Sequence, residues 1–429
     1  MREHRTRGFS RKAGFASGRP GSSAGSIAPE PPSSTRAALR DLVLDSGFDN
    51  LMKTLEEDRE LLCGPRRRWQ PERQAYRYGY DEGRLVFGGR KVRVPKPRVR
   101  SLKGRELELP SWRHFAEEDP LQHRVLEQML VGVSTRNYAR SLEPVQEGLE
   151  SVGTSRSEVS RQFVVRTARR VREFLSRSLA DLDLPVILID GTRMGEHVLV
   201  VALGTDISGR KHVLGVVEGS TESEAVCRAL LGNLVERGLK LERARLFVID
   251  GGKGIHKAVR EVFGAWALIQ RCRVHKLKNV LEHLPEGKRA WVRAAIRRAW
   301  QMGSAGAARG KLKELARQLE AQHPGAARSL LEGLEETLTV LALGVGATLS
   351  QTLRSTNPIE NLQGTLKRVA RNVKHWRGGQ MALRWGVSGL MEAEKGFRRI
   401  RGYREMPQLV AAIEAMVGAK SVDRNEEVA

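Results

Sequence analysis

The sequence predicts a mixed α/β fold in which helical segments precede and follow the sheet. Between residues 185 and 270, three strand-like apolar runs come one after another, and a helix, a strand, a helix and a strand follow them. A purely parallel sheet would alternate strand and helix from the start, so this order favours a mixed sheet. Residues 284–343 are rich in Ala, Arg, Glu and Leu, which is typical of a helical segment.

The individual elements follow from local patterns. Strands are expected at 186–189, 197–203, 212–217, 246–249 and 267–270, with helices at 223–236 and 254–263. Turns at Gly191 and Gly195, and then at Ser208-Gly209, separate the first three strands. After the segment 284–343, a helix begins near Asn357, and the chain stays helical to about residue 416.

Length and charge limit the classes of protein to which this chain can belong. At roughly 150 residues per domain, 429 residues predict about three folded units. Lys and Arg number 74 against 50 Asp and Glu, a net charge of +24, which favours a polyanionic partner such as nucleic acid. No stretch approaches the roughly 20 apolar residues of a membrane-spanning helix. The three distant cysteines argue against a disulfide framework and predict a cytoplasmic protein.

The N-terminal part predicts a basic tail followed by a helix and a hairpin. Residues 1–36 are rich in Arg, Ser, Gly and Pro, which is typical of a disordered tail and also resembles an organellar transit peptide. In the region 37–110, the runs 85–87 and 92–94 flank Gly88-Gly89, and Pro95 and Pro97 are expected to end their pairing. The basic residues that crowd this hairpin are explained equally well by a solvated edge or by a clamp on a DNA backbone.

Residues 111–182 predict a region that resembles a helix-turn-helix. A helix opened by Pro144 and a turn at Gly153 precede Ser155-x-x-Glu158, which is a capping box that starts an Arg-rich helix. Such a helix is a candidate for the major groove, although an ordinary helical pair with a solvated basic face has the same outline. The candidate DNA contacts on this helix are Arg156, Arg161 and Arg166.

Two predicted strands end alike, in Ile-Asp-Gly at Asp190 and at Asp250. An Asp at the end of a buried strand lies at the edge of the sheet, where oxygen ligands can converge on a hard cation. Asp-Gly is also one of the commonest turn dipeptides, so each Asp taken singly is explained at least as well by a turn.

Glu360 lies in the first turn of the predicted helix that begins near Asn357. With Asn357 as N-cap and Pro358 after it, the residue completes a capping box, which alone could explain it. At about 100° per residue, one stripe of this helix carries Glu360, then Gly364 and a row of basic side chains, opposite an apolar stripe. We interpret Lys367, Arg371 and Lys374 as candidate DNA contacts beside a metal ligand, although a plain amphipathic helix is the alternative.

Three carboxylates of this kind suit two Mg²⁺ ions that promote an in-line displacement at phosphorus. No phosphate-binding GxxxxGK[ST] loop is present to compete for that chemistry. Cys272-x-x-His275 supplies only two soft ligands, whereas a zinc site needs three or four. We therefore favour a structural pair, or one next to DNA, over a metal site.

The ordered motifs resemble the bacterial Mutator-type insertion-sequence transposases, over about residues 85–390. The motifs that carry the resemblance are Ile189-Asp190-Gly191-Thr192, Val201-Ala202-Leu203-Gly204 with Leu214-Gly215, Val248-Ile249-Asp250-Gly251-Gly252-Lys253-Gly254, Gln270-x-Cys272-x-x-His275-x-x-x-Asn279, and Ser355-Thr356-Asn357-Pro358-Ile359-Glu360-Asn361-Leu362. Five motifs in the same order are far more specific than any one of them.

The resemblance implies an RNase H-like, retroviral integrase-like core interrupted by an all-helical insertion and preceded by a helical DNA-binding region. It divides the chain into a first core part at 183–283, the insertion at 284–345, C-terminal core helices at 346–416 and a loose tail at 417–429. It implies a DDE triad of Asp190, Asp250 and Glu360, which bind two Mg²⁺ ions, with Mn²⁺ as a substitute. Trp291 and Trp300 lie where related recombinases place a base-stacking Trp, but core residues are the simpler interpretation of both.

The activity implied is hydrolysis of the phosphodiester at a transposon end, followed by joining of the 3′-hydroxyl to another strand. The expected partners are double-stranded DNA, both terminal inverted repeats and target, and a second copy of the chain on that DNA within the bacterial nucleoid. The alternatives are a non-catalytic DNA-binding regulator derived from a transposase, and a structure-selective nuclease on the same core.

Overall fold

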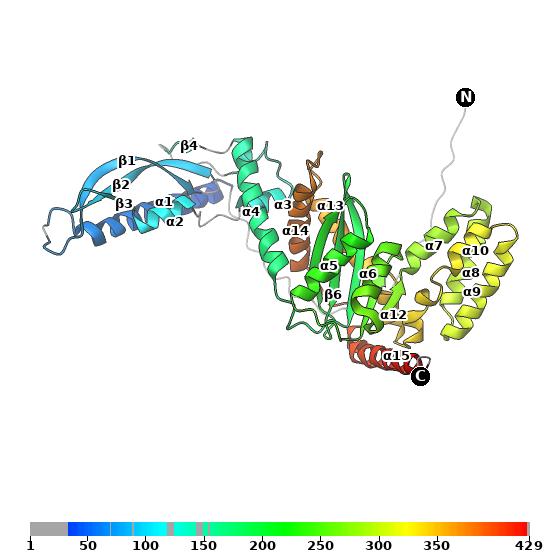
Figure 1. Ribbon diagram of the computed structural model, residues 1–429. Helices are drawn as coiled ribbons and strands as arrows, with labels where there is room; N and C mark the ends of the chain where they lie inside the picture. Colours follow the sequence, from blue (N-terminus) through cyan, green and yellow to red (C-terminus); the bar gives the residue numbers. More distant parts are fainter. Residues whose placement is uncertain are drawn as a thin grey trace, which may run out of the picture.

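The computed structural model describes residues 33–68, 70–87, 90–117, 124–142, 149–152 and 155–426. The predicted turn at Gly88-Gly89, the helix expected from Pro144, the turn at Gly153 and most of the predicted basic tail lie outside these residues. The chain is elongated, with a β-hairpin unit at one end, a sheet in the middle and a helical unit at the other end (Figure 1).

The N-terminal unit packs helix α1 (Ser33–Cys63) and helix α2 (Pro110–Glu117) against a long antiparallel hairpin. Strands β1 (Ala75–Phe87) and β2 (Arg90–Ser101) form the hairpin, and β2 also pairs with β3 (Glu106–Leu107) and β4 (Ser151–Val152). Leu55, Leu85 and Val92 are fully buried between the helices and the hairpin. The unit therefore has a hydrophobic core of its own.

The prediction that Pro95 and Pro97 end the hairpin was wrong, because β2 continues through both to Ser101. The two prolines are two residues apart and so face the same edge of the strand. On that edge β4 pairs only with Lys91 and Val92, and β3 only with Val99 and Arg100. Among the described residues, no neighbouring strand pairs with Pro95 or Pro97 on this edge, so the missing N–H group of each proline costs little stability.

Most basic side chains of the hairpin form ion pairs or ring contacts with other side chains of the protein. Lys91 pairs with Glu158, Arg93 with Glu82 and Glu150, and Arg98 with Glu106. The cations of Lys96 and Arg100 lie over the rings of Trp112 and Tyr78. These contacts favour a solvated, internally neutralised edge over a backbone clamp.

Helix α4 (Arg156–Ser176) connects the hairpin unit to the sheet (Figure 1). Ser155 is its N-cap and accepts a hydrogen bond from the N–H of Glu158, as the capping box predicted. Its apolar face packs on helix α14, where the Phe163 and Trp385 ring centroids are 4.7 Å apart. Shorter elements precede it, namely α3 (Arg124–Leu130) and a 3₁₀ turn at Ala139–Ser141.

The central sheet is mixed, as predicted, and its strand order is β7-β6-β5-β8-β9. The first three strands are antiparallel neighbours, and β8 and β9 add in parallel to β5. The strands are β5 (Val186–Met194), β6 (His197–Thr205), β7 (Lys211–Gly219), β8 (Arg245–Ile249) and β9 (Ala267–Arg271).

Alternating side chains of the sheet pack against two different helical layers. Helices α5 (Glu224–Glu236) and α6 (Lys253–Phe263) cover the face that carries Ile187 and Ile189. Helices α4, α13 (Asn357–Val369) and α14 (Gly379–Lys395) cover the face that carries Val186 and Leu188. The two cores lie on opposite faces of one sheet, which produces three layers.

The segment predicted to be helical forms a separate bundle beyond β9 (Figure 1). Thr339 and Val340 then bond to Ile269 and Gln270, which returns the chain to the sheet. The bundle helices are α7 (Arg273–Glu282), α8 (Glu286–Trp300), α9 (Ala305–Glu320) and α10 (Pro324–Leu331). Helices α11 (Thr339–Ala342) and α12 (Ala347–Leu353) follow and contribute to the core beside the sheet. Short 3₁₀ turns lie at Gly264–Trp266, Glu335–Thr337 and Tyr403–Glu405.

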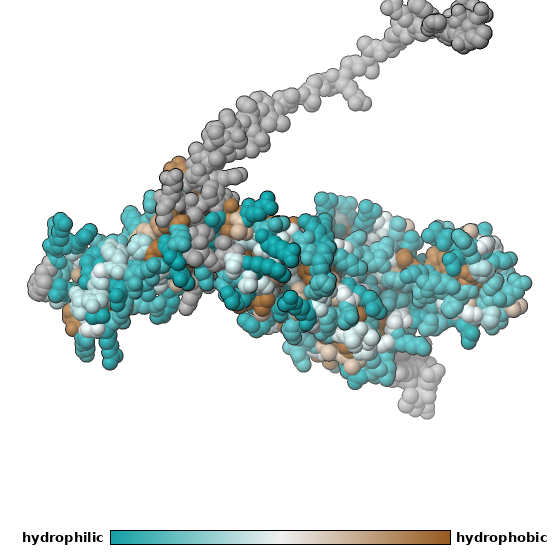
Figure 2. All heavy atoms as spheres, turned by 90° about the horizontal axis from the view of Figure 1, so that it is seen from above, coloured by the Kyte–Doolittle hydropathy of each residue, from teal (hydrophilic) through white to brown (hydrophobic). Residues whose placement is uncertain are grey.

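The C-terminal helix and the molecular surface complete the description. Helix α15 (Met406–Glu426) extends ten residues past the predicted end at 416, and the sequence there contains no proline that would end it. Hydrophilic side chains cover most of the face seen in Figure 2. Within the described ranges, no helix is both long and apolar enough to cross a bilayer.

Glu394 on α14 fixes that helix to the sheet, so its removal is expected to destabilise the fold. Its carboxylate accepts the backbone N–H of Val213 at 2.8 Å and pairs with Arg177 at 3.0 Å. Glu394→Ala should lower the free energy of unfolding by about 1–2 kcal/mol, a value reduced because Arg177 is partly exposed. Urea unfolding measures this.

The matched control is Glu392→Ala on the same helix, because the one ion pair of Glu392 among the described residues is with the exposed Lys395, three residues away. A change within about 0.5 kcal/mol is expected there. Equal losses in both variants would contradict the role assigned to Glu394.

Candidate active site

Asp190 lies inside β5 and not at its end, which corrects the prediction. β5 continues to Met194 because β6 pairs with it along the whole length, including Asp190 opposite Val201. The tight turn comes later, at Gly195, where φ is 67°. Asp190 is the first residue of β5 beyond its pairing with β8, and it is only 6% exposed.

Asp250 follows directly after β8, as predicted, and its neighbour on β5 is Asp190. Ile189 pairs with Ile249 in the parallel ladder, so the two acids that follow are adjacent at one edge of the sheet. The Asp250 carboxylate accepts the N–H of Gly252 at 2.8 Å. Gly251 has a φ of 99°, and the Arg271 guanidinium occupies the space that a Cβ would need.

Arg271 was not singled out by the sequence analysis, although it sets the shape of this turn. Its side chain is buried and donates to the carbonyl oxygens of Gly251 and Glu332. The turn after β8 is thereby tied to the helical bundle. The only sequence signal was an arginine at the end of a buried strand, and nothing in the pattern distinguished it from a surface cation.

Glu360 is in the first turn of α13, but the capping box predicted around it was wrong. The N-cap is Thr356, one residue earlier, and Asn357 is already helical. The Thr356 hydroxyl lies 3.3 Å from Glu360 Oε1, so the carboxylate accepts from a side chain and does not cap the backbone. Gln363, one turn on, donates to the carbonyl of Gly191 at 3.2 Å, which ties α13 to β5 beside Asp190.

The three acidic residues interact electrostatically across 170 residues of sequence. Burial first, and then the negative charges of Asp250, Glu222 and Glu360, raise the pKa of Asp190 to about 7, while His275 opposes them. A carboxyl with such neighbours is protonated at a higher pH than a free one. The structure thus brings Asp190, Asp250 and Glu360 into one electrostatic environment.

Glu222 is a fourth carboxylate at this site, and the sequence analysis missed it. It precedes the N-cap Ser223 of α5, and its side chain lies against the backbone of Gly191, where any Cβ would collide with it. Burial raises its pKa, and Asp250 adds to the shift. Its position one residue before a helix cap gave no signal, since acidic residues are common there.

Cys272 and His275 lie beside the carboxylates, and Cys272 contacts the N-cap residue of α13. The Cys272 sulfur is buried and accepts the N–H and the hydroxyl of Thr356, both at 3.4 Å. Burial raises the pKa of the Cys272 thiol, but contacts with His275 and Thr356 lower it more. His275 has a pKa raised to about 9, first by Cys272 and then by the acids, and its Nε2 is 3.8 Å from Glu360.

The donor set suits a hard divalent cation, because the carboxylates around the buried Asp190 are close enough to raise its pKa and offer only oxygen ligands. A cation would offset the repulsion that raises the pKa of Asp190. As they stand, however, no three His, Cys, Asp or Glu side chains within the described ranges form a group that could hold a metal ion. The chemistry of the residues fits Mg²⁺, and ligand geometry is not defined.

The predicted basic row beside Glu360 is only partly helical. α13 ends at Val369, so Arg371 and Lys374 lie beyond it, and only Lys367 shares the helical stripe. Arg371 donates to the carbonyl of Val131, and Lys374 to that of Arg371. The N–H of Ala370 makes the last α-helical bond, to Leu366, and the N–H of Arg371 bonds instead to Arg368, three residues back, so the α-helical ladder stops there.

The other candidate residues are dispersed. At about 100° per residue, Arg161 lies about 140° from both Arg156 and Arg166 around α4, so the three do not share one face. Trp300 is 7% exposed, as a core residue should be, whereas Trp291 is 46% exposed, so the core interpretation of Trp291 was wrong.

The raised pKa of Asp190 predicts a pH-dependent penalty on stability in EDTA. Because the folded protein holds this proton more tightly than the unfolded chain, stability falls as pH rises from about 4 to 7. Asp190→Asn removes the penalty and should be more stable than wild type at pH 7.5, by on the order of 2 kcal/mol. The difference should shrink toward pH 5 in urea unfolding.

Asp206→Asn is the matched control with the opposite sign. Burial raises the pKa of Asp206, but bonds from His212 and Ser208 lower it more, so its carboxylate stabilises the fold above the usual pKa range. This variant should lose stability at pH 7.5. An Asp190→Asn protein no more stable than wild type at any pH would contradict the repulsion described above.

Comparisons with known proteins agree with the resemblance seen in the motifs. Residues 34–399 match the model of the family described as Transposase, Mutator family. The chain is 26% identical over 394 residues to the transposase of insertion sequence element ISRM5 of Rhizobium meliloti, covering 87% of this chain and 94% of that protein. It is 27% identical over 314 residues to the transposase of IS256 in transposon Tn4001 of Staphylococcus aureus, covering 69% and 75%.

A third relative is the transposase of insertion sequence element IST2 of Acidithiobacillus ferrooxidans, 30% identical over 221 residues, which covers 51% of this chain and 73% of that protein. The family match spans the hairpin unit, the sheet, the helical bundle and α14. The chain belongs to the Mutator family of transposases.

Proposed function

We propose that this protein is a DDE-type DNA transposase of an insertion sequence. In this proposal it binds the terminal inverted repeats, hydrolyses the phosphodiester at the element end and joins the 3′-hydroxyl to another strand. The single observation that supports it best is the electrostatic coupling of Asp190 to Asp250 and Glu360, three acids that the resemblance assigns to catalysis. The names of the relatives, all transposases for insertion sequence elements, are consistent with that activity.

The architecture supports an RNase H-like core as part of the proposal. Three antiparallel strands followed by two parallel ones, with the first Asp on the central strand, are what such a core requires. The helical bundle lies between β9 and α13, which is where an insertion before the last acidic residue would fall. The fold thus brings the first acid, the second acid and the helix of the third to one sheet edge.

In the proposed mechanism, Asp190, Asp250 and Glu360 would hold two Mg²⁺ ions, or Mn²⁺ in their place. When bound, such ions activate the attacking oxygen and stabilise the leaving one. The protein's own contribution is to orient the carboxylates. Thr356 contacts Glu360 directly, and Gln363 holds α13 against β5.

Protonation is the other contribution of the protein. With a pKa near 7, Asp190 holds a proton part of the time at neutral pH and would release it when positive charge enters the site. His275, with its raised pKa, places a positive charge near Glu360. Before a cation binds, this charge would reduce the repulsion among the carboxylates.

We further propose that the protein acts as a dimer on double-stranded DNA in the bacterial cytoplasm, associated with the nucleoid. The net charge of +24 supports a DNA partner. The alternative is a non-catalytic DNA-binding regulator derived from a transposase. It is favoured by the absence, within the described residues, of a ready-made group of three metal-binding side chains.

Substitution of each acid tests the proposal. Asp190→Asn, Asp250→Asn and Glu360→Gln should each reduce cleavage of labelled DNA that carries the element ends by about 10³-fold or more. Binding of the same DNA in a gel-shift assay should persist, because the DNA contacts are made elsewhere. Glu282→Gln, at an exposed acid of α7 that pairs with Lys278, should cleave like wild type. Cleavage by any of the three variants at the wild-type rate contradicts the assignment.

Metal binding can be tested without any activity. With a dissociation constant near 1 mM, 10 mM Mg²⁺ should stabilise the wild-type protein by about 1.4 kcal/mol relative to EDTA, visible as a higher melting temperature. Asp190→Asn and Asp250→Asn should lose this response, since each removes a ligand and a negative charge. NaCl at equal ionic strength is the control. A wild-type melting temperature that does not respond to Mg²⁺ or Mn²⁺ would favour the regulator.

A further inference from the structure

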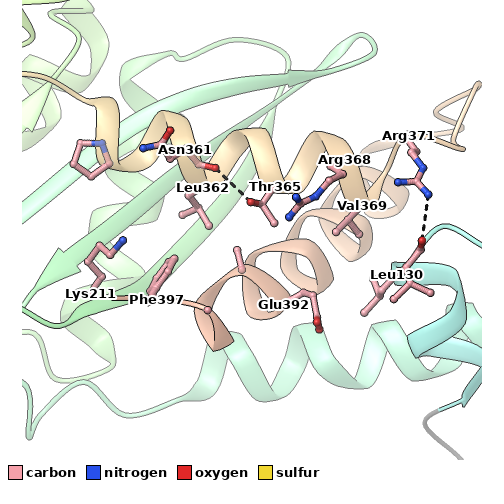
Figure 3. A pocket seen from close by; sticks show the side chains of 14 residues that line it. Leu130, Lys211, Asn361, Leu362, Thr365, Arg368, Val369, Arg371, Glu392 and Phe397 are labelled. Carbon is pink, nitrogen blue, oxygen red and sulfur yellow. Dashed lines mark hydrogen bonds between the residues drawn. The ribbon is translucent and has the colours of Figure 1, made fainter. Parts of the chain in front are cut away.

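A pocket of about 520 Å³ lies between α13 and α14, closed at one end by the start of β7 and at the other by the end of α3. Its size falls within the range of roughly 300–1,000 Å³ that small-molecule sites occupy. Figure 3 shows Lys211 and Phe397 together at one end and Arg368, Val369 and Leu130 at the other.

The pocket combines an apolar floor with a cationic rim. Leu362, Val369 and Leu130 are buried beneath it, and Phe397 adds an aromatic ring. Lys211 Nζ lies 4.5 Å from the centre of that ring, and within the described part of the chain no acidic side chain pairs with the Lys211 ammonium. Burial lowers the pKa of Lys211, which means that its charge lacks a compensating anion.

The rim charges favour an anionic ligand. Lys211, Arg368 and Arg371 face the pocket against one acid, Glu392, whose carboxylate is already engaged by Lys395 at 2.8 Å. Cations around an apolar, aromatic floor are the composition of sites that bind single-stranded nucleic acid, where phosphates meet the cations and bases meet the apolar surface.

The pocket is also connected to the acidic site along one helix. Relative to Glu360, Gly364 lies about 40° further round α13, and Arg368 about 80°. A Cβ placed on Gly364 would meet nothing within 4 Å. The helix surface between Glu360 and the pocket is therefore bare, although glycine inside a helix costs about 0.5–1 kcal/mol relative to alanine.

We propose that this pocket binds a nucleotide of the single DNA strand that passes Glu360, with its backbone crossing Gly364 and its phosphates held by Lys211 and Arg368. The inference extends the proposed function, because it assigns a place to the strand on one side of the cleavage site. The base and sugar would rest on Leu362 and Phe397. Neither residue type is needed for the proposed chemistry of the carboxylates.

The test measures binding of a fluorescent oligothymidylate to the full chain by anisotropy, in EDTA, at several KCl concentrations. Lys211→Gln and Arg368→Gln should each weaken binding about 3- to 10-fold and make the plot of log K against log[KCl] shallower by roughly 0.7. Lys313→Gln, at an exposed lysine of α9 in the helical bundle, is the charge-matched control and should change neither quantity.

The glycine provides an uncharged second test. Gly364→Leu should weaken binding by a similar factor because it obstructs the path, whereas Gly364→Ala should bind nearly as well as wild type. Both should melt at or above the wild-type temperature, since open space surrounds the position. A loss of binding in Gly364→Leu is then not explained by unfolding.

The inference is overturned if wild type does not bind the oligothymidylate, if the Lys211 and Arg368 variants bind with the wild-type salt dependence, or if Lys313→Gln weakens binding equally. These outcomes are separable from failure of the proposed function. Oligothymidylate binding needs neither metal nor cleavage, so it can persist in a protein that cleaves nothing. Conversely, cleavage that depends on Asp190 can survive when the pocket variants bind normally.

Discussion

The arrangement of the active-site region depends on keeping several carboxylates close together in a place with little water. Asp190 is almost fully buried, and Asp250, Glu222 and Glu360 all add negative charge around it. Left alone, such charges would repel one another and separate, or one of them would take up a proton. The raised pKa of Asp190 is the visible result. Everything that fixes these side chains therefore works against their repulsion.

The opposing forces come from hydrogen bonds between segments that are distant in the sequence. The N–H of Cys272 bonds to the carbonyl of Ile249, one residue before Asp250, while its sulfur accepts two bonds from Thr356, the N-cap of α13. A single cysteine thus connects the strand of the second acid to the helix of the third. Gln363 closes the remaining side of the triangle by bonding to Gly191. The cysteine of the C-x-x-H motif is consequently a structural tie at the site.

Much of this site could be predicted, because its acids follow strands whose apolar runs are unambiguous. The five strands of the sheet and the helices between them lie where the sequence analysis expected them. What could not be predicted depends on pairing across the sheet. β5 continues past Asp190 where β6 pairs with it, and Thr356, the N-cap of α13, bonds to the sulfur of Cys272, which is distant in the sequence. Glu222 reaches the site because Gly191 leaves room for it.

The net charge of +24 overstates the surface that is free to bind DNA. Arg245 is 1% exposed and donates to the carbonyls of Leu184 and Lys240, so it serves the core. Arg273 likewise donates to backbone carbonyls of the helical bundle, and Arg271 shapes the turn at Gly251. Because these guanidinium groups bond to buried carbonyls, they contribute little to the electric field outside the protein, and Arg271 and Arg273 also hold the bundle to the sheet. Cations that line an open surface are the ones left to bind a polyanion. Lys211 and Arg368 are two of them, and both line the pocket between α13 and α14.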